Sequence, residues 1–217
     1  MCPAQARSRR RISPPCLAFS FLLTLGWLPP SWAETPEPQL KLGVRTYNYA
    51  AVSGNILLEA EQHAAEIFRR AGIELAWIEC PVSPREVDKF PACTQKGIGS
   101  LAATLKILPE SMAAGFALPL KNFGVTLQHH ASFVFYNRVQ LANRVGLSEA
   151  VVLGHIIAHE LGHLLLGEGG HSDKGIMMED LRVRDFLHAE RGTPLTFSTE
   201  QAERMLARLR PELLAKK

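Results

Sequence analysis

The sequence lacks an N-terminal apolar run long enough to cross a membrane. A spanning helix needs about 20 consecutive apolar residues, and the run at residues 16–28 contains 13. Four arginines precede this run, and Ser31 and Ala33 place small residues at the positions that determine signal cleavage. We therefore predict a cleaved signal peptide over residues 1–33, no stable membrane anchor and a secreted or periplasmic protein. A retained N-terminal anchor is the alternative.

The rest of the chain has no excess of basic charge. The whole sequence has a formal net charge of +3, but four of its 24 lysines and arginines lie in residues 1–33, which contain no acidic residue. The other 184 residues therefore hold 20 basic and 21 acidic side chains. Nucleic-acid-binding domains usually carry a basic face, so nothing here favours nucleic acid as a partner.

Cysteine is scarce. Of the four cysteines, Cys2 and Cys16 lie in the predicted signal, which leaves Cys80 and Cys93. In an exported protein two remaining cysteines most simply form one disulfide. By the chain-entropy model, a loop of this length contributes about 3 kcal/mol to the free energy of unfolding.

Internal repeats are also missing, and residues 34–217 are long enough to form a single domain with its own core. A helix is predicted over residues 54–70, with Ser53 as its cap. Alternating and β-branched residues predict strands at residues 40–52, 73–80, 101–108, 123–127 and 132–136. Strand, helix and strand in this order favour a right-handed crossover and a mixed sheet, which predicts an α+β fold.

Two further helices are predicted in the C-terminal half. The first runs from a cap at Ser148 to Leu166, and its apolar residues predict a helix buried on its back and open along the opposite side. The second opens at Ser198 and ends before Pro211, and its arginines are expected to form a solvated face.

The first of these helices contains the sequence His159-Glu160-Leu161-Gly162-His163. Four helical residues advance by roughly 400° and about 6 Å, so the two histidines lie on one face, one turn apart. Both imidazoles can then reach one zinc ion at about 2.0–2.1 Å. Glu160 flanks the same face, where its carboxylate can take a proton from a metal-bound water without binding the metal.

A hydrolytic zinc site uses three protein ligands and leaves one position for water. We assign His171 as the third ligand, because Gly167 is a natural helix terminator and Glu168-Gly169-Gly170 can turn the chain back under the metal. An acidic third ligand, Glu179 or Glu190, is the alternative.

Residues 159–177 resemble the metzincin metallopeptidases, which carry H-E-x-x-H-x-x-G-x-x-H and a later methionine-containing turn. Gly167 comes one residue later than in that pattern and His171 two residues later. The segment is more closely similar to small secreted bacterial proteins of the HELGHLL…HSxxGIM type, classed as peptidases. The resemblance implies a zincin-like mixed sheet with a buried zinc-binding helix and a C-terminal helix, and it implies that Met177 packs beneath the ligands.

Other polar residues are weaker candidates for a role in metal binding or catalysis. His155 shares the histidine face but lies about 12 Å along the axis from His163, so we expect a core histidine bonded to a backbone carbonyl. The tyrosine that some metzincins carry just after the methionine turn is absent. Candidates for stabilising the oxyanion are His129, His130, Tyr136 and Arg182.

The sequence therefore predicts an exported zinc-dependent endopeptidase that acts on peptide or protein substrates, with Glu160 as general base. The alternatives are a gluzincin-like peptidase with an acidic third ligand and a non-catalytic zinc-binding exported protein. An intact Glu160 favours catalysis, because that residue binds no metal. Nothing in the sequence indicates the substrate or the oligomeric state.

Overall fold

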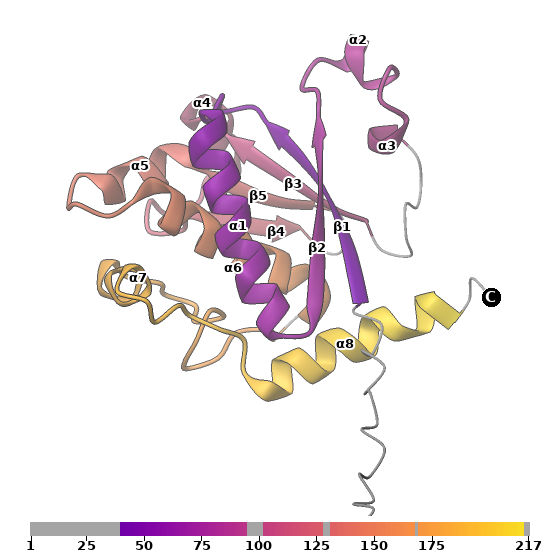
Figure 1. Ribbon diagram of the computed structural model, residues 1–217. Helices are drawn as coiled ribbons and strands as arrows, with labels where there is room; N and C mark the ends of the chain where they lie inside the picture. The colour runs from indigo at the N-terminus through magenta and orange to yellow at the C-terminus, as the bar shows by residue number, and fades with distance from the viewer. Residues whose placement is uncertain (1–39, 95–101, 128–130, 168, 215–217) are drawn as a thin grey trace, which may run out of the picture. The chain divides into compact units, whose positions relative to one another are not determined.

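The described residues form a five-stranded mixed sheet in the order β2-β1-β3-β5-β4 (Figure 1). The computed structural model describes residues 40–94, 102–127, 131–167 and 169–214. Strands β1, β2, β3 and β5 run parallel, and β4 runs antiparallel to β5. The strands are β1 Leu40–Asn48, β2 Ile73–Cys80, β3 Ala102–Leu108, β4 Gly124–Leu127 and β5 Ala131–Phe135. The predicted α+β class and mixed sheet are confirmed.

Strand β1 lies inside the sheet and pairs with both β2 and β3. Its alternating residues Leu42, Val44 and Thr46 are buried, as a strand with one core face requires. The strand ends at Asn48, earlier than predicted, because the Asn48 side chain exchanges two hydrogen bonds of 2.9 Å with the backbone of Val52. A side-chain amide that closes a turn in this way competes with further strand pairing.

Helices α1, Gly54–Arg70, and α6, Glu149–Leu166, pack against each other and against the sheet (Figure 1). Both have the predicted bounds. Ser148 caps α6 by accepting a hydrogen bond from the Val151 backbone, whereas the Ser53 side chain makes no such bond to α1.

Helix α6 is buried over nearly all of its length. Among the described helices it is the one whose length and composition would allow it to cross a membrane, but 89% of it is buried inside the protein. Elements β4, β5, α1 and α8 all pack against it, and its histidine side lines a cleft, as the sequence predicted. Helix α6 is therefore the core helix of the fold.

Helix α8, Thr199–Leu214, packs against α6. Ser198 caps it, as predicted, by accepting a hydrogen bond from the Gln201 backbone. The helix continues through Pro211, whereas the sequence predicted an end before it. A proline in the last turn of a helix removes one backbone hydrogen bond there, and the turn persists without it.

The structure also contains several short helices that the sequence did not predict. They are α2 Pro84–Val87, α3 Pro91–Thr94, α4 Glu110–Ala113, the 3₁₀ helix η1 Ala114–Phe116, α5 Tyr136–Asn143 and α7 Val183–Glu190. Helix α5 begins directly after β5, so Tyr136 is helical although it was predicted in the strand.

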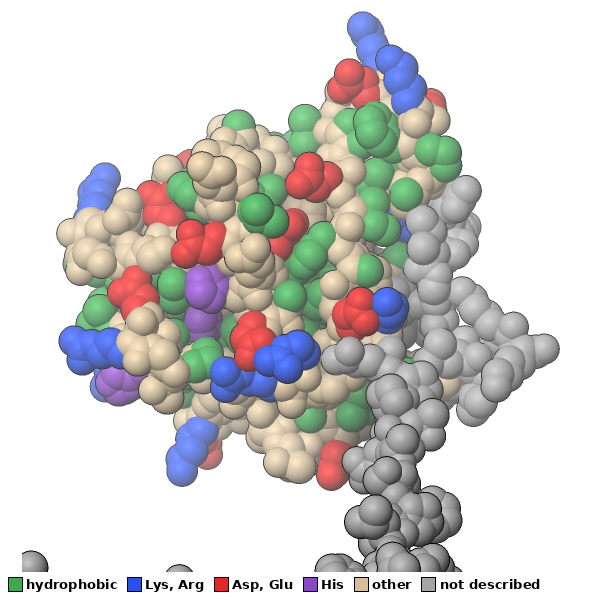
Figure 2. All heavy atoms as spheres, in the orientation of Figure 1, with side chains coloured by type: hydrophobic (Ala, Val, Ile, Leu, Met, Phe, Trp, Pro, Cys, Tyr) green, Lys and Arg blue, Asp and Glu red, His purple; other side chains and the backbone are tan. Residues whose placement is uncertain are grey.

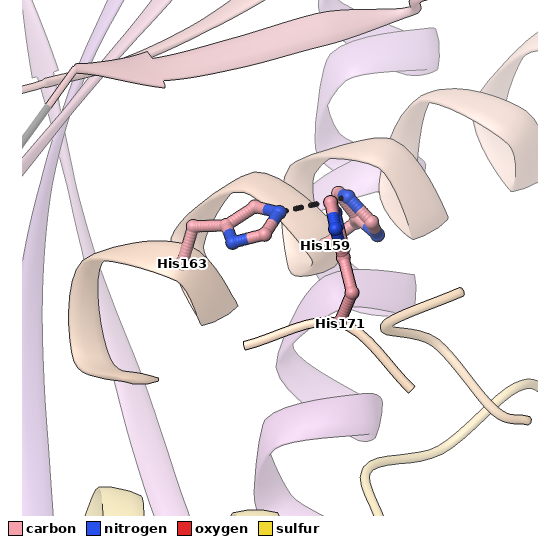
Figure 3. Close-up of side chains that lie close together, drawn as sticks. All are labelled: His159, His163 and His171. Atoms are coloured by element: carbon pink, nitrogen blue, oxygen red, sulfur yellow. Dashed lines mark hydrogen bonds between the residues drawn. The ribbon is translucent and has the colours of Figure 1, made fainter. Parts of the chain in front are cut away.

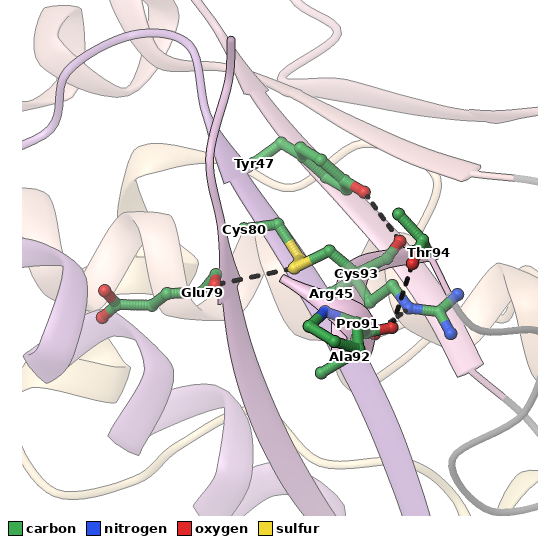
Figure 4. The surroundings of a disulfide bond; sticks show 8 residues. All are labelled: Arg45, Tyr47, Glu79, Cys80, Pro91, Ala92, Cys93 and Thr94. Carbon is green, nitrogen blue, oxygen red and sulfur yellow. Dashed lines mark hydrogen bonds between the residues drawn. A yellow bond between two sulfur atoms is a disulfide. The ribbon is translucent and has the colours of Figure 1, made fainter. Parts of the chain in front are cut away.

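A disulfide joins Cys80 at the end of β2 to Cys93 in α3, as the sequence predicted (Figure 4). The segment between them is also held to β1, because Arg45 Nε donates to Ala92 O at 2.9 Å and the Tyr47 hydroxyl donates to Cys93 O at 3.4 Å. The disulfide therefore closes the segment between Cys80 and Cys93, and hydrogen bonds attach the end of that segment to β1 of the sheet.

Acidic and basic side chains are interspersed over the face that α1 covers (Figure 2). On that helix Glu66 forms ion pairs with Arg69 at 2.7 Å and with Arg70 at 2.9 Å. Exposed pairs of this kind contribute about 0–1 kcal/mol to stability, so packing rather than surface charge holds α1 in place.

Candidate metal centre

Three histidines converge at one point of the structure (Figure 3). His159 and His163 project from α6, and His171 extends toward them from the chain that follows the helix. One ligand nitrogen from each lies within 4.8 Å of the other two. The helix spacing predicted the first pair, and the tertiary structure adds the predicted third histidine.

The two helical histidines have the nitrogen separation expected for two ligands of one tetrahedral zinc ion. His159 Nε2 and His163 Nε2 lie 3.1 Å apart, and two ligands at about 2.0–2.1 Å from one tetrahedral zinc would be roughly 3.3 Å apart. His159 Nδ1 lies 2.8 Å from Ile176 O, so that nitrogen carries the proton and Nε2 keeps its lone pair for the metal. Histidine nitrogens are the ligands that zinc prefers, together with thiolates and carboxylates.

Burial keeps two of these histidines neutral. It lowers the pKa of His159 to about 4, although the hydrogen bond to Ile176 acts in the opposite direction. Burial, together with the neighbouring His159 and His171, lowers the pKa of His163 to about 3. A histidine must be neutral to bind a metal, so both rings are ready to act as ligands at neutral pH.

Glycines shape the loop that carries His171. Gly167 ends α6 as predicted, and its positive φ of 72° turns the chain away from the helix axis. A Cβ on Gly170 would lie 3.1 Å from Leu166 Cβ and 3.4 Å from His163 Nδ1, so a larger residue would crowd the ligand. Glu168, which the sequence also placed in this turn, lies outside the described residues.

Neither acidic alternative for the third ligand belongs to the cluster. Among the described residues, the group that could hold a metal consists of the three histidines alone. The Glu190 carboxylate accepts a hydrogen bond from the Ser148 backbone at the start of α6. Glu179 lines the cleft over the site but lies outside the cluster.

The Glu160 carboxylate lies against β4, and the residue is 5% exposed. Its Oε2 lies 2.7 Å from Thr126 Oγ1, while Ser132 Oγ donates to its backbone carbonyl at 2.9 Å. Thr126 Oγ1 is also 2.8 Å from that carbonyl. Because Ser132 already donates to the carbonyl, the Thr126 hydroxyl can donate its single proton to the carboxylate. Burial raises the pKa of Glu160 to about 8, and the Thr126 hydrogen bond acts in the opposite direction.

Gly124 provides the space for this carboxylate. A Cβ at position 124 would lie 2.6 Å from Glu160 Oε1 and 2.6 Å from Phe133 O. Sequence reasoning missed Gly124, Thr126 and Ser132, because no motif marks them. They reach Glu160 only because β4 and β5 pack beside α6.

The three histidines and Glu160 share one cleft of about 770 Å³. Residues 121–126 and Leu181 also line it. An ion pair of 2.9 Å between Lys121 and Asp180 joins the two segments to which these residues belong. A buried carboxylate and a candidate metal site therefore line the same cleft.

Met177 packs against α6 at Gly162, the residue before His163, and its predicted place beneath the metal ligands stays a prediction. It is fully buried, and a Cβ on Gly162 would lie 2.6 Å from its sulfur. Gly162 therefore allows the methionine to approach α6 between the two helical histidines.

The other predicted residues that the structure describes do not line the cleft. His155 is a core histidine, 1% exposed, with Nδ1 at 2.7 Å from Val151 O. Tyr136 donates to Glu149, and neither Tyr136 nor Arg182 is among the residues that line the cleft. His129 and His130 lie outside the described residues.

No protein-family model matches this sequence, and no curated protein sequence matches it. Among solved structures, the chain is similar to the crystal structure of archaemetzincin from Methanopyrus kandleri. The sequences are 15% identical, the match covers 81% of this chain and 98% of the other, and the TM-score is 0.47. A function for this chain therefore has to be inferred from the geometry of the site itself.

Proposed function

We propose that this protein is an exported zinc-dependent endopeptidase with Glu160 as its general base. The observation that carries the proposal is that three histidine nitrogens within 4.8 Å of one another share a cleft with a buried carboxylate that is outside their cluster. A purely structural zinc site closes with four protein ligands. Three ligands beside a free carboxylate are the composition of a hydrolytic site.

His159, His163 and His171 would hold the metal. Zinc, when bound, supplies a Lewis acid that polarises a carbonyl and lowers the pKa of water. The backbone carbonyl of Ile176 fixes the tautomer of His159, and fixed tautomers of this kind raise metal affinity.

Glu160 would take the proton from the attacking water and then pass it to the leaving amine. Thr126 holds Oε2 of the carboxylate at 2.7 Å, and Gly124 leaves the space that Oε1 occupies. Both contacts orient the carboxylate before substrate arrives, which reduces the cost of reaching the reactive geometry.

The residues that line the cleft support the proposal of a polypeptide substrate. Residues 121–126 are consecutive and include the first three of the four residues of β4, which is an edge strand of the described sheet. An edge strand offers a row of backbone groups with which an extended peptide can pair. We therefore propose that peptides or proteins bind along β4 with one peptide bond over the histidines.

The disulfide supports an oxidising compartment, because such bonds persist in exported proteins and are rare in the cytosol. We accordingly propose export by the N-terminal segment at residues 1–33, which lies outside the described residues. Protein collected outside the cytosol should begin near residue 34 by intact mass.

Glu160→Gln tests the catalytic role. The amide is nearly isosteric and is not a ligand, so the variant should keep its zinc, but it cannot accept a proton. General base assistance contributes about 10²–10⁴-fold, so the rate of peptide cleavage should fall by at least about 100-fold at equal zinc content.

His163→Ala is the control for the metal, and it should lose zinc and activity together. Wild-type protein that carries zinc but cleaves nothing in a broad peptide library would favour a non-catalytic zinc-binding protein. Cleavage that survives Glu160→Gln would point to a contaminating protease.

A further inference from the structure

We propose that Gln201, on the C-terminal helix α8, positions His171 for metal binding. This inference rests on the proposed zinc site, since it concerns the third ligand of that site. Gln201 lies 30 residues beyond His171 in the sequence and is not part of any zinc-binding motif.

His171 depends on its backbone for its position more than the other two histidines do. His159 is buried and its ring is bonded to Ile176 O, and His163 is part of α6. His171 is exposed, and within the described part of the chain no hydrogen bond to its ring is found. It also follows the glycines at positions 169 and 170, and Gly169 has a positive φ of 72°.

Gln201 donates hydrogen bonds to both neighbours of His171, to the backbone of Gly170 and to the side chain of Ser172. Its Nε2 donates to Gly170 O at 3.2 Å and to Ser172 Oγ at 3.1 Å. Ser172 is fixed in turn, because its hydroxyl donates to Lys174 O at 2.8 Å. Gln201 is a charge-neutral polar residue that is 5% exposed; its bond to Gly170 is buried and its bond to Ser172 is partly buried.

The other end of the Gln201 amide determines which way it faces. Its Oε1 accepts a hydrogen bond of 2.9 Å from the Ser198 backbone, and its own backbone donates to Ser198 Oγ at 3.1 Å. This reciprocal pair is a capping box at the start of α8. A flipped amide would place a donor against the Ser198 N–H and an acceptor against Gly170 O, so the observed orientation is the one that satisfies all partners.

Helix α8 also holds the start of the same loop. Arg204, three residues after Gln201, donates from Nη2 to Leu166 O at 3.1 Å. The loop from Leu166 to Ser172 is therefore attached to α8 at both ends. A capping box alone would explain the contacts of Gln201 with Ser198, but not the two bonds to the loop.

Gln201→Glu separates the two roles of this residue. Glutamate keeps an oxygen that can accept from Ser198, as in other capping boxes, but it has no N–H to donate to Gly170 or Ser172. Ser198→Ala is the matched control, because it removes the hydroxyl of the cap and leaves the Gln201 side chain intact.

The measurements are the zinc Kd of the purified full chain, by competition with a chelator, and the absorption spectrum of its cobalt form. Loss of a residue that orients a ligand typically weakens metal binding by about 10–100-fold, so Gln201→Glu should raise the Kd at least about tenfold. Its cobalt spectrum should shift toward that of His171→Ala. Ser198→Ala should change neither the Kd nor the spectrum.

A folded Gln201→Glu variant with the Kd and spectrum of the wild type would overturn the role of Gln201 and leave the zinc site standing. A wild-type chain that binds no zinc would overturn both. If Gln201→Glu does not fold, Ser172→Ala removes one acceptor without altering α8, and it should weaken zinc binding in the same direction. An unchanged Kd in that variant would overturn the proposal.

Discussion

Gly124 and Gly162 leave room for two side chains on which the candidate site depends. A Cβ at either position would lie 2.6 Å from its neighbour, the Glu160 carboxylate in one case and the Met177 sulfur in the other. Gly162 stands out in the sequence, because glycine inside a helix costs about 1 kcal/mol relative to alanine. Gly124 does not stand out, because a glycine at the start of a short strand is equally compatible with a turn or a bulge.

Glu61 allows a residue-scale prediction about stability that is independent of the metal. It is 5% exposed on α1, and burial raises its pKa to about 7, while a hydrogen bond of 3.3 Å from Thr46 acts in the opposite direction. Its pKa in the unfolded chain is near 4.5, so the folded state binds this proton more tightly. The stability that Glu61 contributes is therefore complete below about pH 4.5 and is lost as the pH rises through 7.

Glu61→Gln removes this titration. The free energy of unfolding of the variant, relative to the wild type, should rise by about 3 kcal/mol between pH 4.5 and pH 8. Denaturant unfolding of the metal-free proteins measures it. Glu66→Gln is the control, and its difference curve should have the opposite slope. Arg69 and Arg70 lower the pKa of Glu66, so the stability from these ion pairs is lost as the pH falls. A flat difference curve for Glu61→Gln would contradict the prediction.

At the scale of elements, α6 is the helix around which the fold is arranged. Its bounds were predicted, because a serine cap, a run of apolar residues and a terminal glycine are local signals. The elements that bury it were not predicted to do so, because they come from distant parts of the sequence. Helices α2, α3 and α4 were missed for another reason: each is four residues long, too short to show helical periodicity.

At Gly154, α6 lies close to α1. A Cβ there would lie 2.6 Å from Ala60 O and 2.6 Å from His63 Cβ. Gly154→Ala gains about 1 kcal/mol of helix propensity, but overpacking against a backbone atom costs about 1–3 kcal/mol.

We therefore expect Gly154→Ala to lower the midpoint of thermal unfolding. Gly54→Ala is the matched control, because that glycine begins α1 and has no atom within 4 Å of the added Cβ. It should be neutral or slightly stabilising. Equal melting temperatures for Gly154→Ala and the wild type would show that α1 can move away from α6 at little cost.

At the scale of the whole molecule, the cleft and the disulfide belong to different parts of the fold. The cleft lies beside β4, at one edge of the sheet, whereas Cys80 ends β2, at the other edge. None of the described residues that line the cleft belongs to the disulfide-closed segment. Stability and metal binding should therefore respond separately to loss of the disulfide.

Replacing Cys80 and Cys93 together with serine tests this separation. Closing a loop of this size contributes about 3 kcal/mol to stability, and each kcal/mol corresponds to about 2–4 °C in a domain of 150–250 residues. The melting temperature should fall by several degrees, while zinc content per chain stays the same. A variant that lost zinc while still folded would show that the segment between Cys80 and Cys93 supports the metal site.

The sequence by itself determined the local parts of this protein: the bounds of α1, β2 and α6, the helical spacing of His159 and His163, and the pairing of the two remaining cysteines. Periodicity, capping and composition act over a few residues, so they can be read without knowing the fold. The tertiary structure decided the contacts between distant segments. It placed Thr126 and Gly124 against Glu160, brought His171 to the helical pair and joined Gln201 to the loop beside it, because such contacts depend on how β4, α6 and α8 pack together.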